Sequence, residues 1–67
     1  MSVAKVIEIS AESNQSFEHA IRDGIATASK TVRNIRSAWV KEQQVKVDNT
    51  GKITSYRVDL KLTFVLD

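Results

Sequence analysis

Trp39 and Arg57 carry the side chains in this 67-residue chain that are best suited to holding a ligand. Trp39 is the single tryptophan, and its indole offers a face on which a planar ligand can stack. The guanidinium of Arg57 can bind phosphate or other oxygens, or stack on a ring. Two structural alternatives stay open. Trp39 can seal a subunit interface, and Arg57 can pair with Glu42 or Asp59 across such an interface.

The other polar residues form no recognisable catalytic or metal-binding set. His19, the single histidine, falls beside Glu18 among exposed positions of a predicted helix, so we expect it to be solvated. The chain contains no cysteine, and the Cys/His spacing of a zinc site does not occur. Neither a nucleophile beside a base nor a pair of catalytic carboxylates can be identified. The sequence therefore does not indicate an enzyme.

The segment Asp48-Asn49-Thr50-Gly51 offers several oxygens that could bind a cation. It lacks the length and the closing glutamate of a calcium loop. Asp and Asn side chains form local hydrogen bonds, and Gly51 tolerates a positive φ, so an ordinary turn is the better interpretation. The chain has two glycines, Gly24 and Gly51, and no glycine-rich loop that could bind phosphate.

The elements that must position Trp39 and Arg57 are two long strands. Residues 54–66 alternate strictly between an apolar and a polar side, which predicts a strand with one dry face. Its apolar side comprises Thr54, Tyr56, Val58, Leu60, Leu62, Phe64 and Leu66. Residues 35–48 predict a second strand, joined to the first by a turn as an antiparallel hairpin. Parity places Trp39 and Arg57 on the face turned away from the core.

The second strand contains a fault in its alternation. Ala38 and Val40 share one parity, whereas Val45 and Val47 share the other. A slip of one residue reverses which side chains face the core. We therefore predict a β-bulge within residues 42–44, where one extra residue restores the dry face.

A first strand at residues 3–10 and one helix at residues 14–33 complete the pattern. Ser13 or Asn14 is the expected N-cap, and Gly24 on the apolar stripe predicts a close approach of helix and sheet. Lys30 and Arg33 complement the helix dipole. The apolar stripe should pack on the dry face of residues 54–66; it comprises Phe17, Ala20, Ile21, Ile25, Ala28 and Val32. The fold class is α+β, a β-α-β-β arrangement in which a three-stranded antiparallel sheet wraps around one helix.

Size and composition bound what the chain can do. A single domain over residues 1–67 buries only about 60% of its unfolded surface, so we expect an oligomer. The net charge is +2 with interspersed signs, which does not indicate nucleic acid binding. Apolar runs fall short of the ~18 residues of a membrane span, and a signal peptide is not recognisable. We expect a soluble, cytoplasmic protein.

Several short matches, taken in their order and spacing, resemble the dodecins over nearly the whole chain. They are Lys5-Val6-Ile7-Glu8-Ile9, Ser13, Ala20-Ile21, Ile25-Ala26, Lys30-Thr31-Val32-Arg33, Val40-Lys41-Glu42 and the alternating residues from Tyr56 to Leu66. The resemblance implies a hollow homo-oligomeric shell of twelve subunits. It also implies binding and storage of a flavin (FMN, FAD or riboflavin) rather than catalysis. In flavin-binding dodecins the flavins stack in pairs between tryptophans, and a glutamine contacts the ring edge.

This chain departs from the flavin-binding pattern at two positions. Alignment through Val40-Lys41-Glu42 places Ser37 where those dodecins carry the stacking tryptophan, and Trp39 follows two residues later. The glutamine position is taken by Arg57. The expected flavin-binding set is Trp39, Arg57, Ser37 and Glu42. Asn34-Ile35-Arg36 and Gly51-Lys52-Ile53-Thr54 resemble a branch in which calcium binding is described. The alternative is therefore a flavin-free shell or interaction protein that binds cations.

Overall fold

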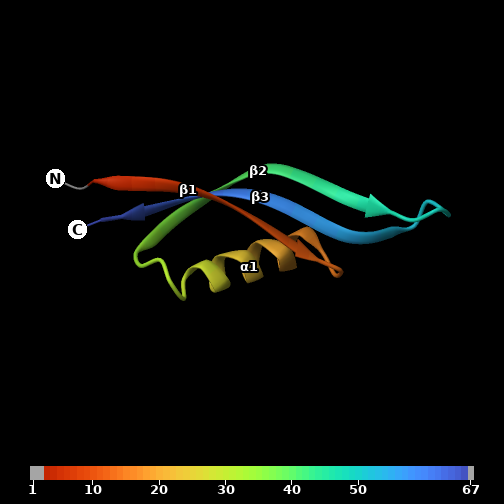
Figure 1. Ribbon diagram of the computed structural model, residues 1–67, viewed down its shortest axis with the longest axis horizontal. Helices are drawn as coiled ribbons and strands as arrows, with labels where there is room; N and C mark the ends of the chain where they lie inside the picture. Colours follow the sequence, from red (N-terminus) through yellow and green to blue (C-terminus); the bar gives the residue numbers. More distant parts are fainter. Residues whose placement is uncertain (1–2, 67) are drawn as a thin grey trace.

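A computed structural model describes residues 3–66 and contains three strands and one helix (Figure 1). The elements are β1 (Ala4–Ser13), α1 (Phe17–Ala28), β2 (Ile35–Val47) and β3 (Ile53–Val65). The strands form one antiparallel sheet in the order β1-β3-β2. The predicted β-α-β-β fold of class α+β is confirmed, with the strand rich in alternating apolar residues at the centre of the sheet.

β1 is longer than the sequence indicated. The predicted strand ended at Ser10, whereas pairing with β3 continues through Ala11, Glu12 and Ser13. Ala11 lies opposite Val58 and Ser13 lies opposite Tyr56. These two positions continue the dry face of the sheet, so tertiary pairing overrides the weak strand propensity of the segment.

The predicted irregularity of β2 is present, but it lies one residue earlier than expected. The register shifts between Val40 and Glu42, which makes Lys41 the additional residue, and the predicted range of 42–44 is therefore wrong by one position. The shift lets Val40 oppose Leu60 and Val45 oppose Tyr56, both on the core-facing side. Two further shifts fall between Ile35 and Ser37 and between Lys46 and Val47.

α1 is shorter than predicted at both ends. The predicted N-caps were wrong: Ser16 caps the helix, and its Oγ accepts the His19 N–H at 3.0 Å. At the other end the hydroxyl and the backbone N–H of Ser29 both donate to the Ile25 carbonyl, at 2.8 and 2.9 Å. The chain then turns and passes through Asn34 with φ 62°. Because the helix ends at Ala28, residues 30–33 lie beyond it and cannot serve its dipole as predicted.

The core lies between α1 and the strands β1 and β3. Ala20, Val58, Leu60 and Leu62 are fully buried, and the helix contributes Phe17, Ile21, Ile25 and Ala28 around them. Phe17 meets Tyr56 edge to face, with ring centroids 5.2 Å apart. The predicted packing is thus confirmed for these helix residues, whereas Val32 follows the helix and is not part of the cluster.

Gly24 marks the predicted close approach of helix and sheet. A Cβ atom at this position would lie 2.9 Å from the Ala11 Cβ, closer than side chains can pack. The helix therefore lies near enough to β1 that only glycine fits. This contact fixes the distance between the two layers.

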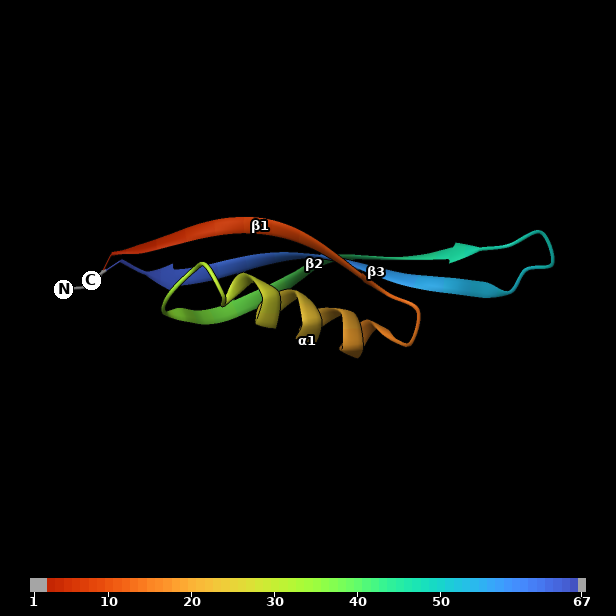
Figure 2. The ribbon, with the colours of Figure 1, turned by 60° about the horizontal axis from the view of Figure 1, so that its bottom comes forward.

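The β2–β3 hairpin extends well past the helix, as Figure 2 shows. The molecule measures 53 × 19 × 13 Å, and α1 contacts β1 and β3 but leaves the core-facing side of β2 largely open. Val40 and Val47 of β2 are consequently exposed, and Ile53 at the start of β3 is exposed as well. Within residues 3–66 no helix is long and apolar enough to cross a membrane.

Candidate functional site

The sheet face opposite α1 carries the predicted ligand-binding residues, and we name it the outer face. Strand pairing places three rows across it, from β2 through β3 to β1. The rows are Trp39, Lys61 and Glu8; then Glu42, Asp59 and Ser10; then Gln44, Arg57 and Glu12. Side chains that oppose one another in an antiparallel pair share a face, so each row is a set of neighbours.

Trp39 lies on the outer face, as parity predicted, because its neighbour Val40 opposes the buried Leu60. Among residues 3–66 it is the most exposed of the large apolar residues, at 68% relative exposure. Ser37, two residues earlier in β2, opposes Thr63 on the same face. The indole therefore offers its surface to solvent beside a small residue that leaves room around it.

Arg57 is held from within its own chain. Its Nε donates to the Ser10 Oγ at 2.9 Å and lies 4.0 Å from Asp59 Oδ1. Of the two partners considered from the sequence, Asp59 is thus the one within reach, along β3 rather than across an interface. These contacts fix the guanidinium on the outer face while its side chain remains solvent-accessible.

A polar cavity of about 320 Å³ opens where β2 bulges. It is lined by Glu42, Gln43, Gln44, Arg57 and Asp59. Glu42 and Asp59 are direct cross-strand partners, so two carboxylates face one another beside a single guanidinium. Oxygen ligands of this kind suit a hard cation. Glu42 and Arg57 are thus brought together, whereas Trp39 and Ser37 lie outside this cavity.

Two ion pairs span the outer face across β3. Lys41 Nζ lies 3.2 Å from Glu8 Oε1, and Lys46 Nζ lies 3.3 Å from Glu12 Oε1. Sequence reasoning missed them because β1 and β2 are not neighbours in the chain. The available signal was the alternation of Glu8 and Glu12 with apolar residues in β1, which places both carboxylates on the outer face.

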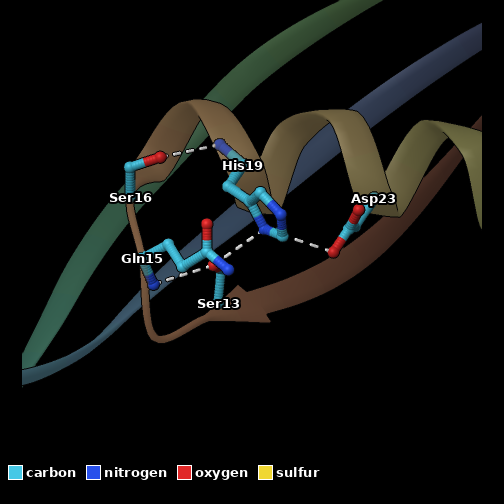
Figure 3. A network of polar contacts seen from close by, with 5 residues as sticks. All are labelled: Ser13, Gln15, Ser16, His19 and Asp23. Atoms are coloured by element: carbon cyan, nitrogen blue, oxygen red, sulfur yellow. Dashed lines mark hydrogen bonds and ion pairs between the residues drawn. The ribbon is translucent and has the colours of Figure 1, made fainter.

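A second polar cluster joins the end of β1 to the start of α1 (Figure 3). His19 Nδ1 lies 3.0 Å from Ser13 Oγ and 3.3 Å from Asp23 Oδ2. Ser13 is buried, and its Oγ also accepts the Gln15 N–H at 3.0 Å. The expectation that His19 is merely solvated is therefore wrong, since it links strand and helix.

The combination of Ser13, His19 and Asp23 does not form a catalytic triad. A triad requires the serine at one ring nitrogen and the carboxylate at the other, so that the proton can pass through the imidazole. Here both groups meet the same nitrogen, Nδ1. The cluster is suited to holding the β1–α1 connection and not to activating the hydroxyl.

The hairpin turn uses Asp48 as a local hydrogen-bond acceptor. Its Oδ1 accepts the Thr50 hydroxyl at 2.7 Å, the Thr50 N–H at 2.8 Å and the Lys52 N–H at 3.1 Å. These bonds, led by the Thr50 hydroxyl, hold the pKa of the carboxyl below its ordinary value of 3.8. Gly51 adopts φ 84° as the turn requires. No group of three or more His, Cys, Asp or Glu that could hold a metal ion occurs within residues 3–66.

Comparison with known proteins identifies the family. The sequence model of the Dodecin family matches residues 3–67. The chain belongs to the dodecin family. The calcium dodecin of Mycobacterium tuberculosis is 45% identical over 64 residues, which cover 96% of this chain and 89% of that protein. The resemblance predicted from short matches is thereby confirmed.

Solved dodecin structures share the fold over their whole length. A variant of the Thermus thermophilus dodecin superposes with a TM-score of 0.91 at 31% identity, covering 100% of this chain and 98% of that one. The dodecin from Streptomyces davaonensis gives 0.91 at 32% identity, with 98% and 96% covered. A calcium-chelating calcium dodecin from M. tuberculosis, described with a novel calcium-binding site, gives 0.83 at 41% identity, with 98% and 93% covered.

In this member of the dodecin family, the outer face divides the predicted site residues into two groups. Trp39 and Ser37 form an open platform with an aromatic surface. Glu42 and Arg57 belong to the polar cavity at the bulge. Arg57 lies four residue steps along β3 from Lys61, the partner of Trp39, which corresponds to about 13 Å.

Proposed function

We propose that this protein is a self-assembling, non-catalytic binding protein that holds a flavin on the outer face, with the isoalloxazine ring stacked on Trp39. The observation that carries the proposal is the 68% exposure of this indole on the face opposite the core. A large aromatic side chain turned to solvent on a polar surface loses hydrophobic stabilisation unless a partner covers it. Family membership supports a flavin as that partner.

The site shape supports a planar ligand. Trp39 supplies the stacking area, and aromatic stacking contributes ~0.5–1.5 kcal/mol beyond the buried area. Ser37, at the position where flavin-binding dodecins are expected to carry tryptophan, offers no stacking surface but leaves space beside the indole. The aromatic platform is thereby displaced by two strand steps, about 6.6 Å, on the same face.

Flavin titration tests this proposal directly. Because Trp39 is the single tryptophan, its emission reports on the site without contribution from other positions. We expect riboflavin or FMN to quench both the indole and the flavin emission with saturation at one flavin per chain. Saturable quenching in the native assembly supports the proposal, and emission that stays unchanged after correction for absorption by the added flavin overturns it.

A second function is favoured by the cavity at the bulge. We propose as the alternative that a calcium ion binds between Glu42 and Asp59, which are cross-strand partners of β2 and β3 in the cavity that Gln43 and Gln44 also line. The name of the M. tuberculosis relative, calcium dodecin, supports this choice of cation. Calcium titration followed by calorimetry tests it: heat in the wild type that is lost in Glu42→Gln supports this site.

A further inference from the structure

Trp39 has a lysine as its direct neighbour on the outer face. Lys61 on β3 opposes it in the register. Directly opposed residues have Cβ atoms ~4.5–5.5 Å apart, so the flexible stem of Lys61 can place its ammonium at the edge of a ring stacked on the indole. Within residues 3–66, Phe17 and Tyr56 contact each other as an aromatic pair, and the indole face of Trp39 is not covered by a cation.

The charges around Trp39 do not cancel. Lys41, two positions further along β2, is bound to Glu8, whose two carboxylate oxygens lie 3.2 and 3.4 Å from the ammonium. Glu8 is also the residue opposite Lys61 on the β1 side. Within the described part of the chain, residues 3–66, no carboxylate lies within ion-pair distance of Lys61. One uncompensated positive charge therefore remains beside the indole.

The next row has the opposite charge. Glu42 and Asp59 face one another there, and the neighbouring Arg57 supplies one positive charge against these two carboxylates. The Nε of Arg57 is already bound to Ser10. The outer face thus changes sign along β3, from positive beside Trp39 to negative at the bulge. An anionic group on a ligand stacked on Trp39 is attracted to Lys61 and repelled from the cavity.

We infer that Lys61 is a specificity-determining residue that selects planar aromatic ligands with an anionic group over their uncharged counterparts. This inference rests on the flavin function proposed above. It assigns the phosphate of FMN to Lys61, and not to Arg57, whose surroundings carry excess negative charge. Phosphate-bearing flavins are accordingly preferred over riboflavin.

FMN and riboflavin form a matched pair of probes, because they differ only by the phosphate group. We expect quenching titrations of the native assembly at low salt to give about fivefold tighter binding of FMN, as for a single solvent-exposed charge pair. The preference should shrink in about 0.5 M KCl, where screening acts over a few ångströms. Lys61→Gln should abolish the preference by weakening FMN binding more than riboflavin binding, and Lys61→Arg should retain it.

Lys46→Gln is the control, since Lys46 lies on the same face but is paired with Glu12 at 3.3 Å. It should keep the FMN preference of the wild type. An unchanged preference in Lys61→Gln overturns the inference alone, as does an equal loss of affinity for both flavins. Absence of quenching by either flavin in the wild type overturns the flavin proposal and this inference together.

Discussion

At the scale of single residues, the apolar surface for stacking and the negative charge for binding a cation lie at different places on the outer face. Trp39 supplies apolar area next to Lys61, whereas Glu42 and Asp59 supply negative charge one row away. A flavin and a calcium ion would therefore use neighbouring but separate groups. Substitutions at Trp39 and at Glu42 can then separate the two proposed functions.

Trp39→Ala should weaken flavin binding more than tenfold, because both the stacking term and the buried ring area are lost. The measurement is flavin quenching, with flavin emission as the signal since the indole is removed. Trp39→Phe is the matched variant and should retain part of the affinity. If Trp39→Ala instead breaks the assembly into smaller species, Trp39 is an interface residue and the stacking role is wrong.

Leu60→Ala should lower the free energy of unfolding by ~2–5 kcal/mol, because Leu60 is 0% exposed at the centre of the core. Chemical denaturation of the assembly at fixed protein concentration measures the loss. Arg22→Ala is a suitable comparison, since this charged side chain on α1 is 76% exposed and its truncation should have little effect. A loss below about 1 kcal/mol for Leu60→Ala would contradict the assignment of the buried face.

At the scale of elements, strand alternation was sufficient to predict which faces are buried and which carry the candidate site. The side-chain period of two makes the face of Trp39 or Leu60 follow from parity alone. The ends of the helix could not be predicted from the residue pattern in the same way. Ser13, Asn14 and Ser16 can each accept a backbone N–H through the side chain, and which of them caps the helix depends on where the tertiary fold places the chain.

The contacts of the outer face were not predictable either. Arg57 meets Ser10, and Lys41 meets Glu8, only because β3 brings β1 and β2 into a common register. His19 was likewise misjudged because Ser13 reaches it from the end of β1. Partners on separate elements depend on the register, which a single sequence does not fix.

Gly24→Ala should destabilise the protein by about 1–2 kcal/mol, because overpacking against the Ala11 Cβ outweighs the gain in helix propensity. The free energy of unfolding measures this change. Ala11→Gly in the same chain removes the atom with which the new Cβ collides and should restore part of the loss. Equal losses with and without Ala11→Gly would show that the close contact is not the cause.

The hairpin turn should depend on pH through Asp48. Because the folded pKa of this carboxyl lies below its ordinary value of 3.8, its contribution is complete above that value. It is lost as the pH falls through the lowered folded pKa. The stability difference between wild type and Asp48→Ala, measured by denaturation across pH, should therefore be constant near neutral pH and shrink under acid conditions. A difference that grows toward low pH would contradict the assignment.

At the scale of the whole molecule, the single chain is more extended than a compact monomer of its length. Its radius of gyration is 13.9 Å, whereas a compact domain of this length has roughly 11 Å. Its accessible surface is 5020 Å², against roughly 4200 Å² for a compact monomer of the same mass. The excess lies where the hairpin passes the helix and the apolar side of β2 is uncovered.

We therefore propose that neighbouring copies cover the core-facing side of β2, and we expect no monomer at micromolar concentration. Light scattering should give a mass several times 7.5 kDa, and the family resemblance predicts a twelvefold multiple. Val47→Asp should shift the mass toward smaller species, because Val47 is 54% exposed on the uncovered hairpin and a buried carboxylate is costly. Lys46→Gln, at the adjacent position on the outer face, should leave the mass unchanged. A wild-type mass near 7.5 kDa would overturn the proposal of an assembly. A dimer or trimer would contradict only the predicted number of subunits. The uncovered strand requires a partner, but it does not by itself determine how many copies close the shell.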